Sequence, residues 1–200
     1  MQSALSSPSG LSPRAESFSS SLPGRITLVV AASVLVAACA HVTLPLPFTP
    51  VPLTLQTFAV ILIGMFLGPI AGFSAMMLYL AEGAMGMPVF SPQGPGGIAQ
   101  LLGPTAGYLF AYPLAAAAAG WTVRVLPKSK IASRFTRAVL AGVAANVIFF
   151  ALGAAWLAQL LHLSGTAVWT LAVAPFLLGE VIKITAAAGL YSTLQRWQRS

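Results

Sequence analysis

Long apolar segments, separated by short breaks, are the sequence feature that most limits how this chain can fold. Residues 26–40, 53–84, 104–123, 138–161 and 167–193 are nearly free of charged side chains. Roughly 20 apolar residues in a helix cross the hydrocarbon core of a bilayer, and most of these segments are long enough. With 58% apolar and 6% charged residues, the chain lacks the composition of a water-soluble domain. We therefore predict an integral membrane protein.

The segment 53–84 is too long for one simple span, and Gly68 and Pro69 divide it. Proline is favourable in the first turn of a helix and disrupts a helix interior. We therefore predict two shorter spans, residues 54–67 and 69–83. The predicted fold is all-α, a polytopic protein with six transmembrane helices.

Positive charges predict the orientation of these spans. Nine of the ten Lys and Arg residues lie before the first span, in residues 124–137, or after the last span. With six spans all three segments share one side, which the positive-inside rule identifies as the cytoplasm. Both termini are thus predicted to be cytoplasmic, with a disordered Ser/Pro-rich tail (1–24) preceding a six-helix membrane domain (25–195). The net charge of +7 is a topology signal, and no nucleic-acid partner is expected.

Irregular segments fall on the opposite, outer side of the membrane in this topology. Residues 41–53 contain four prolines, which favour an extended or turning chain. Residues 84–103 are rich in glycine and proline and uncharged, so we predict a long loop that folds back on the protein. Pro175 lies near the start of the last span and is predicted to unwind it.

Glu180 and Lys183 are the main candidates for a functional site. Apart from Glu82, which lies at a segment edge and is predicted to be a solvated interface residue, they are the only charged residues inside the spans. Each costs roughly 2.5–3.5 kcal/mol in hydrocarbon, so such residues normally face a functional cavity. Their spacing of three places them on one helix face. A purely structural ion pair is the alternative, but buried pairs stabilise poorly compared with apolar packing.

Other polar residues within the spans are weaker candidates. Gln56 and Tyr108 lie near the outer ends of their helices and are predicted ligand contacts. Tyr79, Tyr112 and Asn146 are interpreted as interhelical hydrogen-bonding groups, which are common in membrane proteins.

Motifs for catalysis or metal binding are missing from the sequence. Cys39 is the only cysteine, and no His/Cys cluster has metal-ligand spacing. No glycine-rich phosphate loop ends in Lys-Ser/Thr, so the chain is not expected to hydrolyse ATP itself. We predict no enzymatic activity, metal or cofactor. One open alternative is that residues 36–39 form a lipoprotein processing site with Cys39 acylated.

Four stretches together resemble the BioY family: TPVPLTLQTFAV (49–60), LAEGAMGMPVFS (80–91), GPGGIAQLLGPTAGY (94–108) and PFLLGEVIK (175–183). The resemblance implies a six-helix, biotin-binding S component of an energy-coupling-factor (ECF) importer. It also implies that residues 25–195 form a substrate-binding domain in the bacterial inner membrane. Such a component captures biotin from outside and works with a transmembrane coupling subunit and cytoplasmic ATPases. A stand-alone ion-coupled carrier, in which Glu180 takes up a proton, is the alternative.

The resemblance also implies roles for individual residues. The acid and lysine of the family's last-helix motif match Glu180 and Lys183, although the acid is more usually Asp. The family's glycine-rich loop matches residues 94–97, so Gly96 and Gly97, with Gln93 nearby, are predicted to contact the ligand. The family shows an Ala-xxx-Ala docking surface for the coupling subunit on its first helix. The nearest equivalent here comprises Ser33, Ala37 and Ala40.

A cyclic urea, as in biotin, has two N–H donors and one carbonyl acceptor. Glu180 is predicted to accept from the N–H groups and Lys183 to donate to the carbonyl. The ligand's carboxylate would then lie toward the glycine-rich loop. The reverse orientation, with Lys183 on the carboxylate, remains an alternative.

Overall fold

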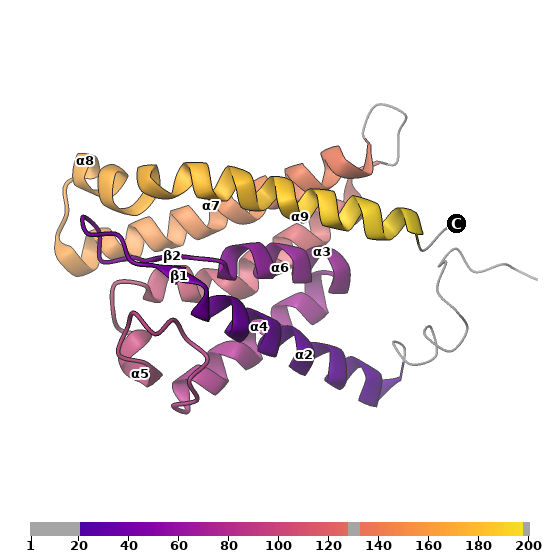
Figure 1. Ribbon diagram of the computed structural model, residues 1–200, viewed down its shortest axis with the longest axis horizontal. Helices are drawn as coiled ribbons and strands as arrows, with labels where there is room; N and C mark the ends of the chain where they lie inside the picture. The colour runs from indigo at the N-terminus through magenta and orange to yellow at the C-terminus, as the bar shows by residue number, and fades with distance from the viewer. Residues whose placement is uncertain (1–20, 128–132, 198–200) are drawn as a thin grey trace, which may run out of the picture.

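The structure, a computed structural model, describes residues 21–127 and 133–197 and is predominantly helical (Figure 1). Most of these residues belong to the helices α2 (Leu22–His41), α3 (Gln56–Leu67), α4 (Pro69–Ala84), α6 (Ala106–Val125), α7 (Arg134–Leu161) and α9 (Leu177–Trp197). Shorter elements are helices α5 (Gly97–Gln100) and α8 (Gly165–Val168) and strands β1 (Thr43–Leu44) and β2 (Leu53–Thr54). The strands and α5 lie at one end of the bundle, and α2 begins and α9 ends at the other (Figure 1).

Helix α6 lies at the centre of the packing, against α3, α4 and α7. Its inner face is made of small side chains, and Ala111, Ala115, Ala116 and Ala119 are fully buried. The backbone of α3 comes so close that a Cβ on Gly64 would lie 2.3 Å from the Ala116 carbonyl oxygen. Close helix contacts through small residues are typical of membrane proteins, where dispersion replaces the hydrophobic effect between helices.

The predicted break between the second and third segments is confirmed. Helix α3 ends at Leu67, Gly68 has a φ of 85°, and Pro69 begins α4. A positive φ at this turn suits glycine, since other residues rarely adopt it. The break divides the long apolar segment at the predicted place.

Three helical stretches in the described residues are long and apolar enough to cross a membrane: Leu22–His41, Arg134–Leu161 and Gly165–Trp197. Helices α3 and α4 have 12 and 16 residues. At about 1.5 Å per residue they are shorter than the roughly 30 Å hydrocarbon core of a bilayer. The architecture is that of an all-α membrane protein.

The N-terminal prediction falls mostly outside the described residues, which exclude 1–20. Helix α2 begins at Leu22, a few residues before the expected first span, because Ser21 caps it and Pro23 suits its first turn. Arg25 therefore belongs to the helix. Residues 128–132, within the predicted basic segment, are also outside the described ranges.

The proline-rich and glycine-rich segments behave as predicted. Thr43 pairs with Thr54 and Leu44 with Leu53 in a short antiparallel ladder, with the prolines in or beside its connection. The glycine-rich loop folds back on the bundle and buries Phe90 against Gly83. Both segments cover the same end of the helices (Figure 1).

The prediction for Pro175 is also confirmed. Before α9 the chain forms a π-helical turn (Trp169–Val173) and then a 3₁₀ turn (Ala174–Phe176). Proline lacks an N–H, so it interrupts the regular hydrogen-bond ladder at this point. Regular α-helix resumes at Leu177, which places Glu180 in the first turn of α9.

Candidate functional site

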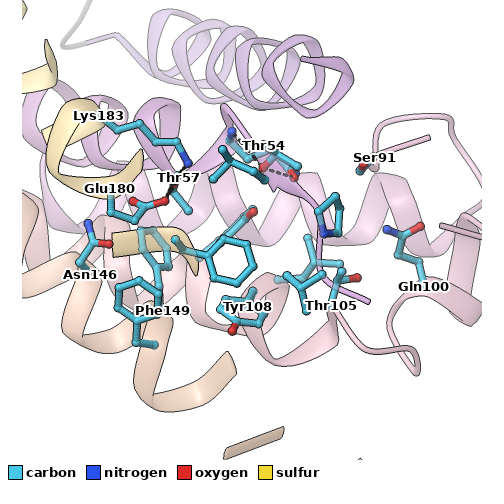
Figure 2. A pocket seen from close by; sticks show the side chains of 18 residues that line it. Thr54, Thr57, Ser91, Gln100, Thr105, Tyr108, Asn146, Phe149, Glu180 and Lys183 are labelled. Carbon is cyan, nitrogen blue, oxygen red and sulfur yellow. Dashed lines mark hydrogen bonds and ion pairs between the residues drawn. The ribbon is translucent and has the colours of Figure 1, made fainter. Parts of the chain in front are cut away.

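A cavity opens at the end of the bundle that carries the strands, and it contains about 570 Å³ of empty space including its mouth. It lies among the β1–β2 segment, α3, α6, α7 and the start of α9 (Figure 2). The polar lining side chains are Thr54, Gln56, Thr57, Ser91, Gln100, Thr105, Tyr108, Tyr112, Asn146, Glu180 and Lys183. The apolar lining includes Val51, Leu53, Leu109, Phe149, Phe150 and Phe176.

Glu180, Lys183 and Thr57 form a hydrogen-bonded triangle on one wall. Lys183 Nζ lies 2.7 Å from Glu180 Oε1 and donates to Thr57 Oγ1 at 3.0 Å. The Thr57 hydroxyl in turn donates to Glu180 Oε1 at 2.8 Å. Both charged residues are buried, with 6% and 8% of their surface exposed. The predicted pair is thus present, and it faces the cavity rather than the bundle interior.

The irregular start of the last helical stretch is held by two side chains. Thr49 donates to the Leu171 carbonyl at 2.7 Å, and Tyr108 donates to the Ala172 carbonyl at 2.5 Å. A π-helical turn leaves such carbonyls outside the regular ladder, and buried polar groups need partners. Tyr108, a predicted ligand contact, therefore lines the cavity while its hydroxyl proton is used within the protein.

Gln56 also lines the cavity, but its amide is already paired. Gln56 Nε2 donates to Tyr79 Oη at 2.6 Å, and Tyr79 donates to the Val89 carbonyl at 2.9 Å. Thr54 donates to Gln56 Oε1 at 3.1 Å. Gln56 thus connects the cavity wall with the glycine-rich loop.

Within the part of the chain that the structure describes, two buried acceptors on the cavity wall have no hydrogen-bond partner. These are Glu180 Oε2 and Asn146 Oδ1. The Asn146 amide nitrogen donates to the Gly142 carbonyl at 3.2 Å, so only its oxygen is free. Unpaired buried acceptors are costly, and they suit a ligand that brings N–H donors.

Aromatic rings form much of the remaining wall. Tyr112 packs edge-on against Phe149 with 5.6 Å between ring centroids, and Tyr108 lies 6.4 Å from Phe176. Together with the polar triangle, they make a pocket that combines aromatic surfaces with convergent polar groups. Sites for small organic molecules have this character.

The glycine-rich loop contributes differently from the prediction. Gln100 and Ser91 are the loop residues on the cavity wall, whereas Gln93 lines a neighbouring cavity that shares Pro52, Gln100 and Thr105 with it. Gly96 and Gly97 have positive φ angles of 71° and 58° and shape the turn into α5. The Gly96 N–H donates to Gln100 Oε1 at 3.1 Å, so these glycines position Gln100 rather than line the main cavity.

The predicted docking stripe does not form an outer surface. Ser33 and Ala40 are fully buried and Ala37 is half-buried, because this face of α2 packs against its neighbours. The Ser33 hydroxyl donates to Glu82 Oε2. Glu82 is therefore a half-buried partner of α2, not merely a solvated interface residue.

Thr57, Asn146, Tyr112 and Gln100 are lining residues that the sequence reasoning did not select. Asn146 and Tyr112 carried a signal, since each is a polar group inside an apolar span. Thr57 carried a weaker one, as threonine hydroxyls commonly bond their own backbone. No group of three or more His, Cys, Asp or Glu side chains suited to a metal ion occurs in residues 21–127 and 133–197.

Comparisons with known proteins agree on one family. The family model described as "BioY family" matches residues 13–200. "Probable biotin transporter BioY" of Pyrococcus horikoshii is 37% identical over 146 residues, covering 73% of this chain and 82% of the relative. "Biotin transporter BioY" of Rhodobacter capsulatus is 32% identical over 185 residues, covering 88% and 95%.

A solved structure has a similar fold. The crystal structure of "the S-component for biotin from an ECF-type ABC transporter" matches with a TM-score of 0.78, covering 93% of this chain and 95% of that one, at 21% identity. The extent of the family match and the identity to these relatives show that the chain belongs to the BioY family.

Proposed function

We propose that this chain is the membrane-embedded, biotin-binding S component of an ECF-type vitamin importer. The observation that carries the proposal is the Glu180–Lys183–Thr57 triangle on the wall of a cavity that aromatic, aliphatic and polar side chains line together. Named relatives of this chain are biotin transporters, and the cavity has the chemistry that their named ligand requires.

The donor and acceptor groups of the cavity suit a cyclic urea. Glu180 Oε2 is a free anionic acceptor, and Lys183 uses two of its three ammonium protons within the triangle. A urea N–H can donate to Glu180 Oε2, and the urea carbonyl can accept a hydrogen bond from the remaining ammonium proton of Lys183. The aromatic rings then pack against the apolar part of the ligand, with its carboxylate toward Gln100 and the glycine-rich loop.

We also propose six spans in the inner membrane with both termini in the cytoplasm. Arg25, Arg134 and Arg196 lie near the end of the bundle opposite the strands, where α2 and α7 begin and α9 ends (Figure 1). Positive residues favour the cytoplasmic side. The cavity then opens outward, as capture of an external vitamin requires.

Energy for import would come from partners: a transmembrane coupling subunit and cytoplasmic ATPases. The sequence contains no glycine-rich phosphate loop of the ATP-hydrolysing kind. We propose that the coupling subunit contacts the lipid-facing side of α2 rather than the buried stripe at Ser33 and Ala40. Ligand binding would close the outer loops before the ligand moves inward.

Titration of the purified chain with biotin tests the site. We expect Glu180→Gln and Lys183→Met each to lower affinity roughly tenfold to a hundredfold, since hydrogen bonds to charged groups are worth about 1.5–3 kcal/mol. Glu82→Gln is the matched control, because it makes the same chemical change outside the cavity lining. Unchanged affinity in both site variants would contradict the proposed site.

Uptake measurements test the energy source. Cells that contain the chain with a coupling subunit and its ATPases should import biotin in an ATP-dependent manner. Import that collapses with an uncoupler while ATP stays high would favour the stand-alone ion-coupled carrier instead.

A further inference from the structure

Three buried side-chain atoms in the described ranges lack a hydrogen-bond partner: Arg137 Nε, Asn146 Oδ1 and Glu180 Oε2. The last two line the same cavity, and both are acceptors. Asn146 is buried, with 6% of its surface exposed, and lies on α7, outside the motif that contains Glu180. An unpaired acceptor of this kind is destabilising unless a donor arrives from elsewhere.

The orientation of the Asn146 amide follows from its one hydrogen bond. The group that faces the Gly142 carbonyl must be the NH₂, because a carbonyl oxygen can only accept. The amide oxygen is therefore the atom available to the cavity. In Figure 2 the Asn146 amide lies beside the Glu180 carboxylate on the same wall.

The packing of α7 against α9 explains why these two acceptors belong to one cavity. The two helices run antiparallel (Figure 1), and a Cβ on Gly142 would lie 2.8 Å from Ile184 Cγ2. Residue 146 is one turn beyond 142 on α7, and residue 180 is one turn before 184 on α9. In an antiparallel pair these positions are level with each other.

The number of free acceptor atoms shows why the Glu180 carboxylate alone is insufficient for the two N–H groups of a cyclic urea. Glu180 Oε1 already accepts from both Lys183 and Thr57. Only Oε2 is free, and the two N–H groups of a urea ring point away from each other on either side of the carbonyl. The second N–H therefore requires an acceptor other than Oε2, and Asn146 Oδ1, on the neighbouring helix, is an unpartnered acceptor of a residue that lines the same cavity.

We infer that Asn146 Oδ1 and Glu180 Oε2 each accept one ring N–H of the bound cyclic urea, so that Asn146 is a specificity-determining ligand contact. The inference rests on the proposed function and revises the expectation that Glu180 accepts from both N–H groups. It implies that the site rejects ligands in which either N–H is replaced, since one buried acceptor then stays unpaired.

Binding titrations with biotin and two analogues, each methylated on one urea nitrogen, test the inference. The wild-type chain should bind biotin and lose affinity for both analogues. Asn146→Ala should bind biotin roughly tenfold to a hundredfold more weakly. One of the two analogues carries its methyl group in place of the N–H that faces residue 146. Asn146→Ala should bind this analogue as well as the wild-type chain does.

Asn146→Ser is the second variant. A serine hydroxyl can still donate to the Gly142 carbonyl, but it lacks an amide oxygen that reaches the cavity. It should show the same ligand-selective pattern with the helix bond retained. Thermal unfolding in detergent checks that both variants fold.

The possible outcomes separate the two proposals. Failure of the wild-type chain to bind biotin would overturn the proposed function. Normal wild-type binding, combined with variants that lose equal affinity for all three ligands or lose none, would overturn only the role of Asn146.

Discussion

Thr57 joins the charged pair on α9 to helix α3. Its hydroxyl donates to Glu180 and accepts from Lys183, so the hydroxyl proton and one lone pair are both used. The side chains of an i,i+3 pair can adopt several rotamers while they stay paired. A hydrogen bond to a third residue on another helix selects one of these arrangements. Thr57 therefore positions the free carboxylate oxygen toward the cavity.

At this scale we predict that Thr57→Val lowers biotin affinity roughly tenfold, because the carboxylate loses a donor and the ammonium loses an acceptor. Valine conserves the shape of threonine, so packing should change little. Titration of the purified variant measures the effect. Thr185→Val is the matched control, since the Thr185 hydroxyl bonds Val181 on the exposed face of α9. Equal losses in both variants would contradict a role for Thr57 in the site.

At the scale of elements, the close approach of α3 and α6 sets the shape of the bundle. Gly64 faces the Ala116 backbone, and a Cβ there would lie 2.3 Å from a carbonyl oxygen. Backbone atoms cannot move aside as a flexible side chain can, so the helices would have to separate.

We therefore expect Gly64→Ala to lower the stability of the protein by about 1–3 kcal/mol, as overpacking in a well-packed core does. Thermal unfolding in detergent is the measurement. Gly189→Ala on α9 is the control, since a Cβ there meets nothing within 4 Å. It should leave stability unchanged or raise it slightly, because alanine favours helix. A Gly64→Ala variant as stable as wild type would show that α3 and α6 are less tightly packed.

The Gln56–Tyr79–Val89 hydrogen bonds connect the cavity wall to the glycine-rich loop. Tyr79 accepts from Gln56 and donates to the Val89 carbonyl, so its hydroxyl is the link between α3 and the loop. We predict that Tyr79→Phe speeds amide hydrogen exchange in residues 85–96 and raises the biotin dissociation rate. Exchange elsewhere in the bundle, for example in α7, serves as the internal control. Uniformly faster exchange would instead indicate general loosening of the fold.

The sequence predicted those elements whose causes are local. Gly68 and Pro69 ended one helix and began another, and Pro175 disturbed the start of the last one, because backbone chemistry acts at the residue itself. Which face of α2 is buried could not be predicted in this way, because it depends on contacts with helices that are distant in the sequence. Ser33 and Ala40 were expected to be exposed, but small residues serve equally well at an internal contact and an external one, and only the tertiary packing distinguishes them.

The candidate site was predictable where a residue was costly in the membrane. Glu180 and Lys183 stood out because charge inside hydrocarbon requires a reason. Asn146 gave the same signal more weakly, since an amide can be satisfied by its own helix. Its importance became visible only through the register of α7 against α9 and the unpaired oxygen that results. Gln100 carried no signal, because its position depends on the turn at Gly96 and Gly97.

At the scale of the whole molecule, the cavity lies at one end of the bundle, and the helix ends that carry Arg25, Arg134 and Arg196 lie at the other. Under the proposed function, the cavity faces outward and the basic end faces the cytoplasm. The three predicted basic segments lie on the same side of the membrane only if an even number of spans separates each segment from the next. The orientation of the bundle, and the crossing between the glycine-rich loop and the central basic segment, can therefore be tested by labelling.

We predict that single cysteines in a Cys39→Ser background react with a membrane-impermeant maleimide according to side. Met87→Cys, in the exposed part of the outer loop, should be labelled in intact cells. Ser133→Cys, the exposed residue that caps the start of α7, should be labelled only after permeabilisation. Retained biotin binding by each variant would show that the fold is intact. Labelling of both positions in intact cells would contradict the proposed topology, because residues 87 and 133 would then lie on the same side and an odd number of spans could not separate them.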